Sequence, residues 1–477
     1  MLRSFIAAFS VLIVQPLLAS GGRWIEVKTP HFELYTQVDE QQALEALQNF
    51  EQARTFFLQT DVGSKLGEAS VRILDVASET EYAPYLVKPG AYACYQRGRR
   101  GDYIVMRDLN PHHYAIAVHE YTHFVVERAG LKLPIWLNEG IAEFYATVEP
   151  HGTQWLAGRP QPGRVQVLQK QRRLGLETLF SVDGASPYYN DPDKMQIFYA
   201  ESWALTHMLA AGTGYYKHFD EFVSAMSSGR SEEQAFELAW GKDVASVEAD
   251  LDRYLRQSLS GLLYDTKVRQ NDSEPEIAEL PQKDLDLSFA DLLSSNPYAA
   301  PGVEQKLIEL SRKHPDDPGF EELLGYLALR EKRTELAESH FSNAVERQSK
   351  DPVAVYHSAR LQQSSGASAD QVIPLLERAL ELNPDYLPAR IDLGFAAAKA
   401  NRFDLAVATL AELKSVDAKM AFEVYFTVAY CDLRLNRFQD AATYAAAAQQ
   451  SARSVDQQSR AATMIRMIDS RQVSAIQ

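Results

Sequence analysis

Short runs in which apolar and polar residues alternate dominate the first hundred residues of the chain. This period of two is typical of β-strands that bury one face. The expected strands are 24–28, 31–35, 71–76, 91–96 and 103–106. Between the second and third runs, residues 39–59 have apolar positions at helical spacing. The pattern therefore predicts a small mixed sheet accompanied by helices.

Helical spacing also dominates residues 110–148, where end signals divide it into two helices. Asn110 suits the N-cap of the first helix, and Pro111 suits its first position. Gly130 suits the left-handed residue that ends a helix, and Pro134 begins the second one. The last expected strand leads directly into this helix pair.

The first helix of the pair carries the pattern His-Glu-x-x-His. His119 and His123 are four residues apart, so both imidazoles project from one face of the helix and can bind one metal ion. Glu120 lies beside that face, where a carboxylate can reach a metal-activated water without replacing it. Residues 119–123 therefore predict a zinc site in which Glu120 is the general base.

A catalytic zinc ion usually takes three protein ligands, so a third ligand must come from another segment. The sequence Trp136-Leu137-Asn138-Glu139-Gly140, on the second helix, resembles the third-ligand helix of the gluzincin metallopeptidases. This resemblance implies that Glu139 completes the set with His119 and His123, and that Glu143 orients a histidine ligand. It also implies an α+β zincin-like catalytic domain with one Zn²⁺ per chain.

Two further positions follow from the same resemblance. Tyr199 lies sixty residues after Glu139, where aminopeptidase-type gluzincins have a tyrosine that donates its hydroxyl to the oxyanion. The alternative for Tyr199 is a core aromatic on an amphipathic helix. Ala93 stands where those aminopeptidases have the glutamate that binds the substrate's amino group, which favours an endopeptidase over an aminopeptidase.

Three other histidines are weaker candidates. His207 is an alternative oxyanion partner, but it lies two turns deeper in the helix of Tyr199, where packing is the simpler explanation. His112 and His113 lie at the start of the metal-binding helix, far from its ligand face, and a solvated helix start accounts for them.

A different period appears beyond residue 298. The sequence 401–406, Asn-Arg-Phe-Asp-Leu-Ala, returns thirty-five residues later as Asn-Arg-Phe-Gln-Asp-Ala at 436–441. Small and large apolar residues at 324–344 and 379–406 fall in the same frame, which resembles the tetratricopeptide (TPR) consensus. The resemblance implies an all-α TPR solenoid at 299–470 whose concave face binds a peptide or a partner protein.

Composition limits the classes of partner. The 477 residues are too many for one core, and 64 acidic against 48 basic residues give a net charge of −16. This charge argues against a nucleic-acid binder and against an anionic membrane surface. The two cysteines, Cys94 and Cys431, fall in different expected domains, so both are expected to be buried thiols.

The beginning of the chain resembles a secretory signal peptide. A basic start precedes a short apolar run that is interrupted by Gln15-Pro16, which favours cleavage near residue 20 over a membrane anchor. We therefore expect an exported protein, periplasmic or secreted, without stable membrane insertion. The expected organisation is a signal peptide at 1–20, the peptidase domain at 21–265, an acidic linker at 266–298 with room for one short helix, and the solenoid.

Three functions are compatible with these features. The first is a zinc metallopeptidase whose TPR domain recruits substrate or a partner. The second is a non-catalytic TPR scaffold that carries a peptidase-like domain, since repeat arrays are commonly interaction modules. The third is a metal-dependent amidase that acts on cell-wall material. The complete set of His119, Glu120, His123 and Glu139 favours the first.

Overall fold

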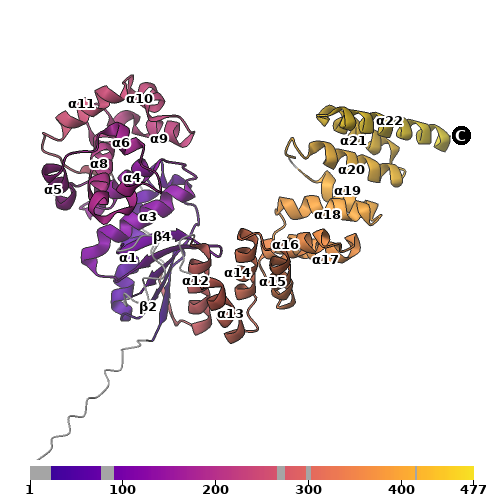
Figure 1. Cartoon of the computed structure of the whole chain (residues 1–477), viewed down its shortest axis with the longest axis horizontal. Helices are drawn as coiled ribbons and strands as arrows, with labels where there is room; N and C mark the ends of the chain where they lie inside the picture. The colour runs from indigo at the N-terminus through magenta and orange to yellow at the C-terminus, as the bar shows by residue number, and fades with distance from the viewer. Residues whose placement is uncertain (1–22, 77–90, 266–273, 297–301, 414–415, 477) are drawn as a thin grey trace, which may run out of the picture. The chain divides into compact units, whose positions relative to one another are not determined.

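The alternating runs of the N-terminal half form one mixed sheet in the computed structural model, as the sequence predicts (Figure 1). The strand order is β4-β5-β3-β2-β1-β9. The pairs β2–β3 and β3–β5 are parallel, and the other neighbours are antiparallel. The strands are β1 (Ile25–Lys28), β2 (Phe32–Thr36), β3 (Val71–Asp75), β4 (Ala93–Arg97), β5 (Asp102–Met106) and β9 (Glu276–Glu279).

The chain divides into two units, Met1–Ala299 and Ala300–Gln477, each of which has its own core. The predicted signal peptide, residues 1–20, lies outside the described residues. No helix in the described part of the chain is both long enough and apolar enough to cross a lipid bilayer. The structure describes residues 23–76, 91–265, 274–296, 302–413 and 416–476.

One face of the sheet packs on helices α1 (Glu40–Phe57) and α3 (Tyr114–Arg128). Residues that alternate along the strands, such as Ile73 and Ile104, join aromatic residues of both helices in the main core of this unit. Asp39 caps α1 by accepting a hydrogen bond from the backbone N–H of Gln42. The buried residues that alternate along the strands and those that recur at helical spacing along α1 thus pack into a single apolar layer.

The other face of the sheet is covered by α12 (Gln282–Ser295), which corrects the predicted linker at 266–298. Leu285 and Leu292 of α12 are buried against Leu74 and Val105, and β9 extends the sheet beside β1. The acidic composition of this segment hides three buried leucines, of which Leu285 and Leu292 are seven residues apart and therefore lie on one face of the helix. Residues 274–296 are thus part of the N-terminal unit.

Asp291 holds α12 in place although it carries a charge. Its carboxylate accepts hydrogen bonds from the backbone N–H groups of Arg99 and Arg100 at 2.8 Å and from the hydroxyl of Tyr103 at 2.9 Å. The side chain of Asp291 is fully buried, so these three donors replace the water that it loses.

The two predicted helices of residues 110–148 are α3 and α4 (Ile135–Tyr145). Asn110 caps the start as predicted, but Pro111 opens a short 3₁₀ turn (Pro111–His113) from which α3 continues. Gly130 has a φ of 70°, the left-handed conformation that ends α3. The turn between the helices is therefore fixed by the residues that the sequence indicates.

Further helices and a small second sheet complete the N-terminal unit. Strands β6 and β7 form a hairpin, and β7 also pairs with β8. These strands are β6 (Glu149–His151), β7 (Gln154–Ala157) and β8 (Leu262–Asp265). The helices are α5 (Pro162–Lys170), α6 (Leu176–Phe180), α7 (Pro187–Asn190), α8 (Pro192–Ala211), α9 (Phe219–Ser227), α10 (Glu232–Trp240) and α11 (Val244–Tyr254), with short 3₁₀ turns at Gly63–Lys65 and Tyr216–His218.

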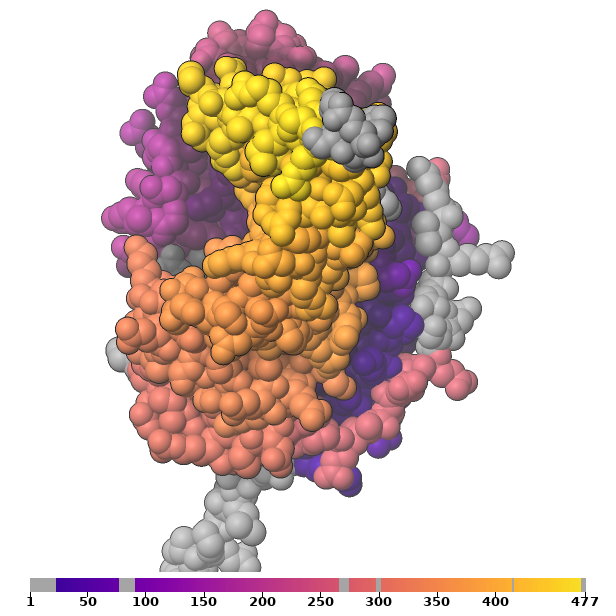
Figure 2. Space-filling view, turned by 90° about the vertical axis from the view of Figure 1, so that its right-hand side faces the viewer, coloured from indigo at the N-terminus to yellow at the C-terminus, as the bar shows by residue number. Residues whose placement is uncertain are grey.

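The C-terminal unit is a stack of helices that follow one another in chain order (Figure 1). Its surface colour changes from salmon through orange to yellow in the same order (Figure 2). A residue with positive φ ends the first helix of successive pairs at Lys332, Gly366, Asn401 and Asn436. These positions are 34 or 35 residues apart, which is the predicted period. The helices are α13 (Val303–Lys313), α14 (Gly319–Arg330), α15 (Thr334–Glu346), α16 (Pro352–Ser364), α17 (Ala369–Leu382), α18 (Leu387–Lys399), α19 (Phe403–Ala411), α20 (Ala421–Arg434), α21 (Phe438–Ser451) and α22 (Val455–Ile476).

Close helix packing explains the small residues of the repeat. A methyl group on Gly325 would lie 2.7 Å from the ring of Phe341, and one on Gly394 would lie 2.3 Å from Leu410. Cys431 is buried in this unit and Cys94 in the other, as expected for two separate thiols.

If α12 is part of the folded N-terminal unit, Asp291→Ala destabilises the protein. We expect a loss of about 2 kcal/mol, because the buried hydroxyl of Tyr103 loses its acceptor and α12 loses its anchor. Thermal unfolding followed by circular dichroism measures this. Glu276→Ala, an exposed position on β9, is the control and leaves the melting temperature unchanged. Equal melting temperatures for both variants would restore the linker interpretation.

Candidate metal centre

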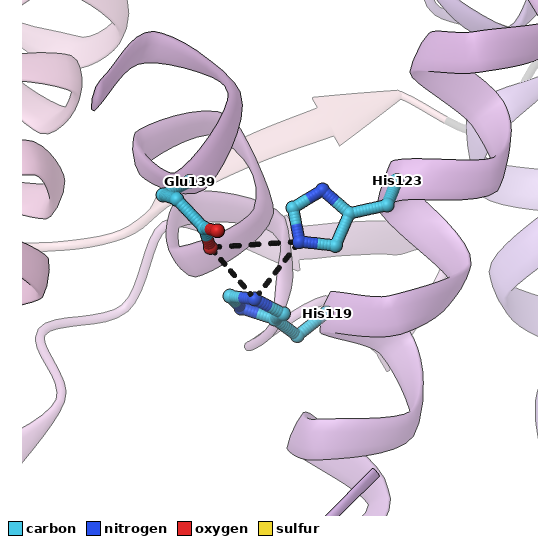
Figure 3. A group of neighbouring side chains, drawn as sticks. All are labelled: His119, His123 and Glu139. Carbon is cyan, nitrogen blue, oxygen red and sulfur yellow. Dashed lines mark hydrogen bonds and ion pairs between the residues drawn. The ribbon is translucent and has the colours of Figure 1, made fainter. Parts of the chain in front are cut away.

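Helices α3 and α4 bring the three predicted metal ligands together. His119 and His123 project from α3 toward Glu139, which comes from α4 (Figure 3). The Nε2 atoms of the two histidines are 3.2 Å apart. Oε2 of Glu139 lies 3.3 Å from Nε2 of His119 and 3.5 Å from Nε2 of His123. The three atoms thus form a nearly equilateral triangle.

The size and chemistry of this triangle fit zinc. Zinc bonds to nitrogen and oxygen ligands of about 2.0–2.1 Å, in a tetrahedral arrangement, place the ligand atoms about 3.3 Å apart. Two imidazoles and one carboxylate are a common donor set for a catalytic zinc ion with one open position. Among the described residues, these three form the one group of histidine, cysteine and acidic side chains close enough to hold a metal ion.

The electrostatics of the site favour a cation. The side chain of Glu139 is 5% exposed, and those of both histidines are 13% exposed. Burial lowers the pKa of His123, but the nearby carboxylates of Glu139 and Glu120 outweigh this and raise it to about 9. The negative charges of Glu139 and Glu120 favour a proton on His123. They equally favour a metal ion bound to this ring instead of the proton.

Two residues to which the sequence assigns no role contact the candidate ligands. Oδ1 of Asn138 lies 3.3 Å from Nδ1 of His123, the ring nitrogen away from the triangle. The hydroxyl of Tyr189, on α7, donates to Oε1 of Glu139 at 2.8 Å and leaves Oε2 facing the histidines. Asn138 could have been found from its place in the Asn-Glu-Gly motif, whereas no spacing in the sequence points to Tyr189.

Glu143 lies one turn beyond Glu139, on the side of His119. Its Oε1 is 3.6 Å from Nδ1 of His119, the ring nitrogen away from the triangle. Arg164 of α5 binds both carboxylate oxygens, at 2.6 and 2.9 Å, and Gln161 donates to Oε2 at 3.0 Å. Neither Arg164 nor Gln161 was expected from the sequence.

Glu120 lines the cleft beside the ligand triangle. Its Oε2 accepts a hydrogen bond from the backbone N–H of Tyr95, on β4, at 2.6 Å. Strand β4 ends the sheet among the described residues, and Ala93 on this strand lines the same cleft. The cleft has two chambers of about 370 and 360 Å³, and His119, Glu120 and Ala93 line both.

Tyr199 also lines both chambers of the cleft. It lies in the third turn of α8, which begins at Pro192. Burial, followed by the negative charges of Glu139 and other nearby groups, raises the pKa of the Tyr199 phenol well above its usual value. Tyr199 is therefore a neutral phenol that can donate a hydrogen bond inside the cleft.

The three weaker candidates, His207, His112 and His113, lie away from the ligand triangle. His207 is fully buried, with Nδ1 at 2.8 Å from the hydroxyl of Tyr254 and Nε2 at 2.8 Å from the carbonyl oxygen of Gly158. Both ring nitrogens are therefore occupied, and burial lowers the pKa of His207 to about 4. His112 is exposed, and His113 contacts Asp108, so neither faces the ligands.

Gly140 allows α4 to approach α8 closely enough to build this cleft. A methyl group at residue 140 would lie 2.1 Å from Oγ1 of Thr206 and 2.6 Å from the carbonyl oxygen of Ser202. Any side chain would therefore push apart the helices that carry Glu139 and Tyr199. This contact gives the glycine of the Asn-Glu-Gly motif a packing role.

We expect Gly140→Ala to destabilise the protein by about 1–3 kcal/mol, because the methyl group overpacks the α4–α8 contact. Chemical denaturation of the purified variant measures this. Gly163→Ala is the matched control, since Gly163 lies in α5 and a methyl group there meets no atom within 4 Å. The control is expected to be neutral or slightly stabilising. A Gly140→Ala variant as stable as the control would show that the two helices can separate without loss.

Comparisons with known proteins identify the C-terminal unit. Residues 367–425 match the tetratricopeptide repeat family model. No curated protein matches the chain. Similar solved structures include YrrB, "a TPR protein with an unusual peptide-binding site", with 16% identity, a TM-score of 0.31, and coverage of 36% of this chain and 87% of that one.

Two further solved structures are similar to part of this chain. TTC0263, a thermophilic TPR protein in Thermus thermophilus, has 18% identity, a TM-score of 0.23 and coverage of 38% of this chain and 98% of that one. PilW, a type IV pilus biogenesis factor, has 14% identity, a TM-score of 0.26 and coverage of 40% and 87%. Together with the helix pairs and their 34–35-residue period, the family match shows that the C-terminal unit is a TPR-like helical solenoid.

Proposed function

We propose that the N-terminal unit is a zinc-dependent hydrolase that cleaves peptide bonds, and that the TPR unit binds its substrate or a partner protein. The observation that carries this proposal is the triangle of His119, His123 and Glu139, with 3.2–3.5 Å between the ligand atoms, in a cleft that Glu120 also lines. Zinc, when bound, supplies a Lewis acid that polarises a carbonyl group and activates water for attack.

Glu120 takes the proton of the attacking water and transfers it to the amine that leaves. Because the N–H of Tyr95 holds Oε2, we assign the proton transfer to Oε1. Tyr199 donates its phenolic hydrogen bond to the carbonyl oxygen as negative charge develops there. The backbone of β4 lies along the same cleft, which suits a substrate that binds as an extended strand.

The cleft favours cleavage within a chain over removal of an N-terminal residue. None of the described residues of the cleft-lining strand segment, 91–97, carries a carboxylate that could neutralise a substrate ammonium group. His119 and Glu120 line both chambers, and the two chambers together can receive residues on both sides of the scissile bond. Both observations support an endopeptidase.

A second candidate is a non-catalytic TPR scaffold that carries a peptidase-like domain. The tetratricopeptide match at 367–425 favours it, because this match concerns the TPR unit and not the proposed zinc site. TPR-like solenoids act as interaction surfaces. The two candidates differ in whether the triangle holds zinc and whether Glu120 transfers protons.

Glu120→Gln separates the candidates. We expect this variant to hold as much zinc as the wild type, because Glu120 is not among the three ligands, and to lose hydrolysis by about 10²–10⁴-fold, because the base is absent. Zinc is measured by elemental analysis. Cleavage of unfolded proteins is measured by mass spectrometry of the new termini, and internal cuts support an endopeptidase.

Glu127→Gln, an exposed position on the same helix, is the control and keeps full activity. A wild-type protein with less than about half an equivalent of zinc, or one that holds zinc but cleaves nothing, would favour the scaffold. Stepwise loss of N-terminal residues would contradict the role assigned to Ala93.

A further inference from the structure

We propose that Arg164 is a positioning residue of the metal centre, which holds Glu143 against His119 and fixes Tyr199 at the cleft. This inference rests on the proposed function, because it concerns the geometry of the same site. Arg164 comes from α5, a short helix that contributes none of the predicted ligands. Its contacts nevertheless join α4 and α8, the helices that carry Glu139 and Tyr199.

The first contact is a bidentate ion pair with Glu143. Nη2 of Arg164 lies 2.6 Å from Oε1, and Nε lies 2.9 Å from Oε2. The side chain of Glu143 is 4% exposed, so its charge is removed from water and needs this partner. Two parallel hydrogen bonds fix the plane of the carboxylate as well as its distance.

The fixed carboxylate sets the surroundings of His119. Oε1 of Glu143, the oxygen that Nη2 binds, is also the oxygen 3.6 Å from Nδ1 of His119. A carboxylate at this ring nitrogen orients the imidazole and increases its basicity toward a metal. Without Arg164, the buried carboxylate would lose the partner that fixes its plane, and the orientation of the ring would be lost.

The second contact is with α8. The guanidinium carbon of Arg164 lies 5.2 Å from the centre of the Tyr199 ring, within the range of a cation–π contact. Nη1 donates to Oε1 of Gln196 at 3.3 Å, one turn earlier on the same helix. A planar guanidinium can make all these contacts at once. The ammonium of lysine can replace the charge but not the pair of parallel hydrogen bonds to one carboxylate.

A double-mutant cycle tests this role. Zinc affinity is measured by competition with a chelator for the full chain, for Arg164→Met, for Glu143→Gln and for the double variant. We expect Arg164→Met to weaken zinc binding about 10–100-fold, as is typical when a partner of a metal ligand is removed. In the Glu143→Gln background, Arg164→Met is expected to weaken zinc binding by less than about a further threefold, because residue 143 no longer carries a charge for Arg164 to hold.

Two further variants separate positioning from general stability. Arg164→Lys keeps the charge and is expected to recover part of the zinc affinity, and it replaces Arg164→Met in the cycle if the latter does not fold. Arg159→Met removes an exposed arginine that pairs with Glu149 and leaves zinc affinity unchanged. Circular dichroism of the zinc-free proteins shows which variants are folded.

The outcomes are distinct. Zinc affinity of a folded Arg164 variant within twofold of the wild type, or effects of Arg164 and Glu143 that simply multiply, would overturn the positioning role while the proposed hydrolase stands. A wild-type protein that binds zinc without cleaving peptides would contradict the hydrolase alone, since the cycle is read from affinities. A wild-type protein that binds no zinc would overturn both.

Discussion

The burial of two carboxylates on one short helix is the constraint on which the N-terminal unit depends. Helix α4 has eleven residues, of which nine are buried, and Glu139 and Glu143 are both among the nine. A buried carboxylate without a partner is strongly destabilising, so each of these needs positive charge or hydrogen-bond donors nearby. Helices α3, α5 and α7 each supply a partner to one of these carboxylates.

The two carboxylates meet the requirement in different ways. Glu143 has a permanent cation, because Arg164 binds both of its oxygens and is charged at any physiological pH. Glu139 has the hydroxyl of Tyr189 on one oxygen and two titratable imidazoles on the other. The groups that face its second oxygen are thus imidazoles and not a guanidinium, and this difference is why we propose a ligand role for Glu139 and a positioning role for Glu143.

The sequence predicts the parts of this arrangement that depend on local spacing. The i, i+4 histidines, the helix ends at Asn110 and Gly130 and the alternation of the strands each depend on residues close in the chain. The period of the TPR unit is equally visible, because each helix pair packs mainly on its neighbours and repeats its small residues. Such patterns are recorded in the spacing of residue types.

Contacts between segments that are distant in the chain cannot be predicted from the spacing of residue types. Arg164 reaches Glu143 from twenty-one residues away, and Tyr189 reaches Glu139 from fifty residues away, through loops whose course the sequence does not specify. The sequence predicts a linker where α12 lies, because the donors of residues 99–103 that allow Asp291 to be buried are distant in the chain. In each case a polar residue resembled a solvated one because its partner lies far along the chain.

The charges also bear on the choice between enzyme and scaffold. Well-packed apolar residues in place of a buried ion pair often leave stability unchanged or increase it. A domain whose only task was to support a solenoid would therefore gain little from two buried carboxylates, Glu139 and Glu143, and from the partly exposed arginine that pairs with one of them. This chain also keeps Glu120 on the cleft, held by the backbone of β4, where it makes no comparable contribution to packing. Such an arrangement lowers the stability of a domain that only supports a solenoid, whereas it suits a cation site with a base beside it. This is the physical reason to test hydrolysis before partner binding.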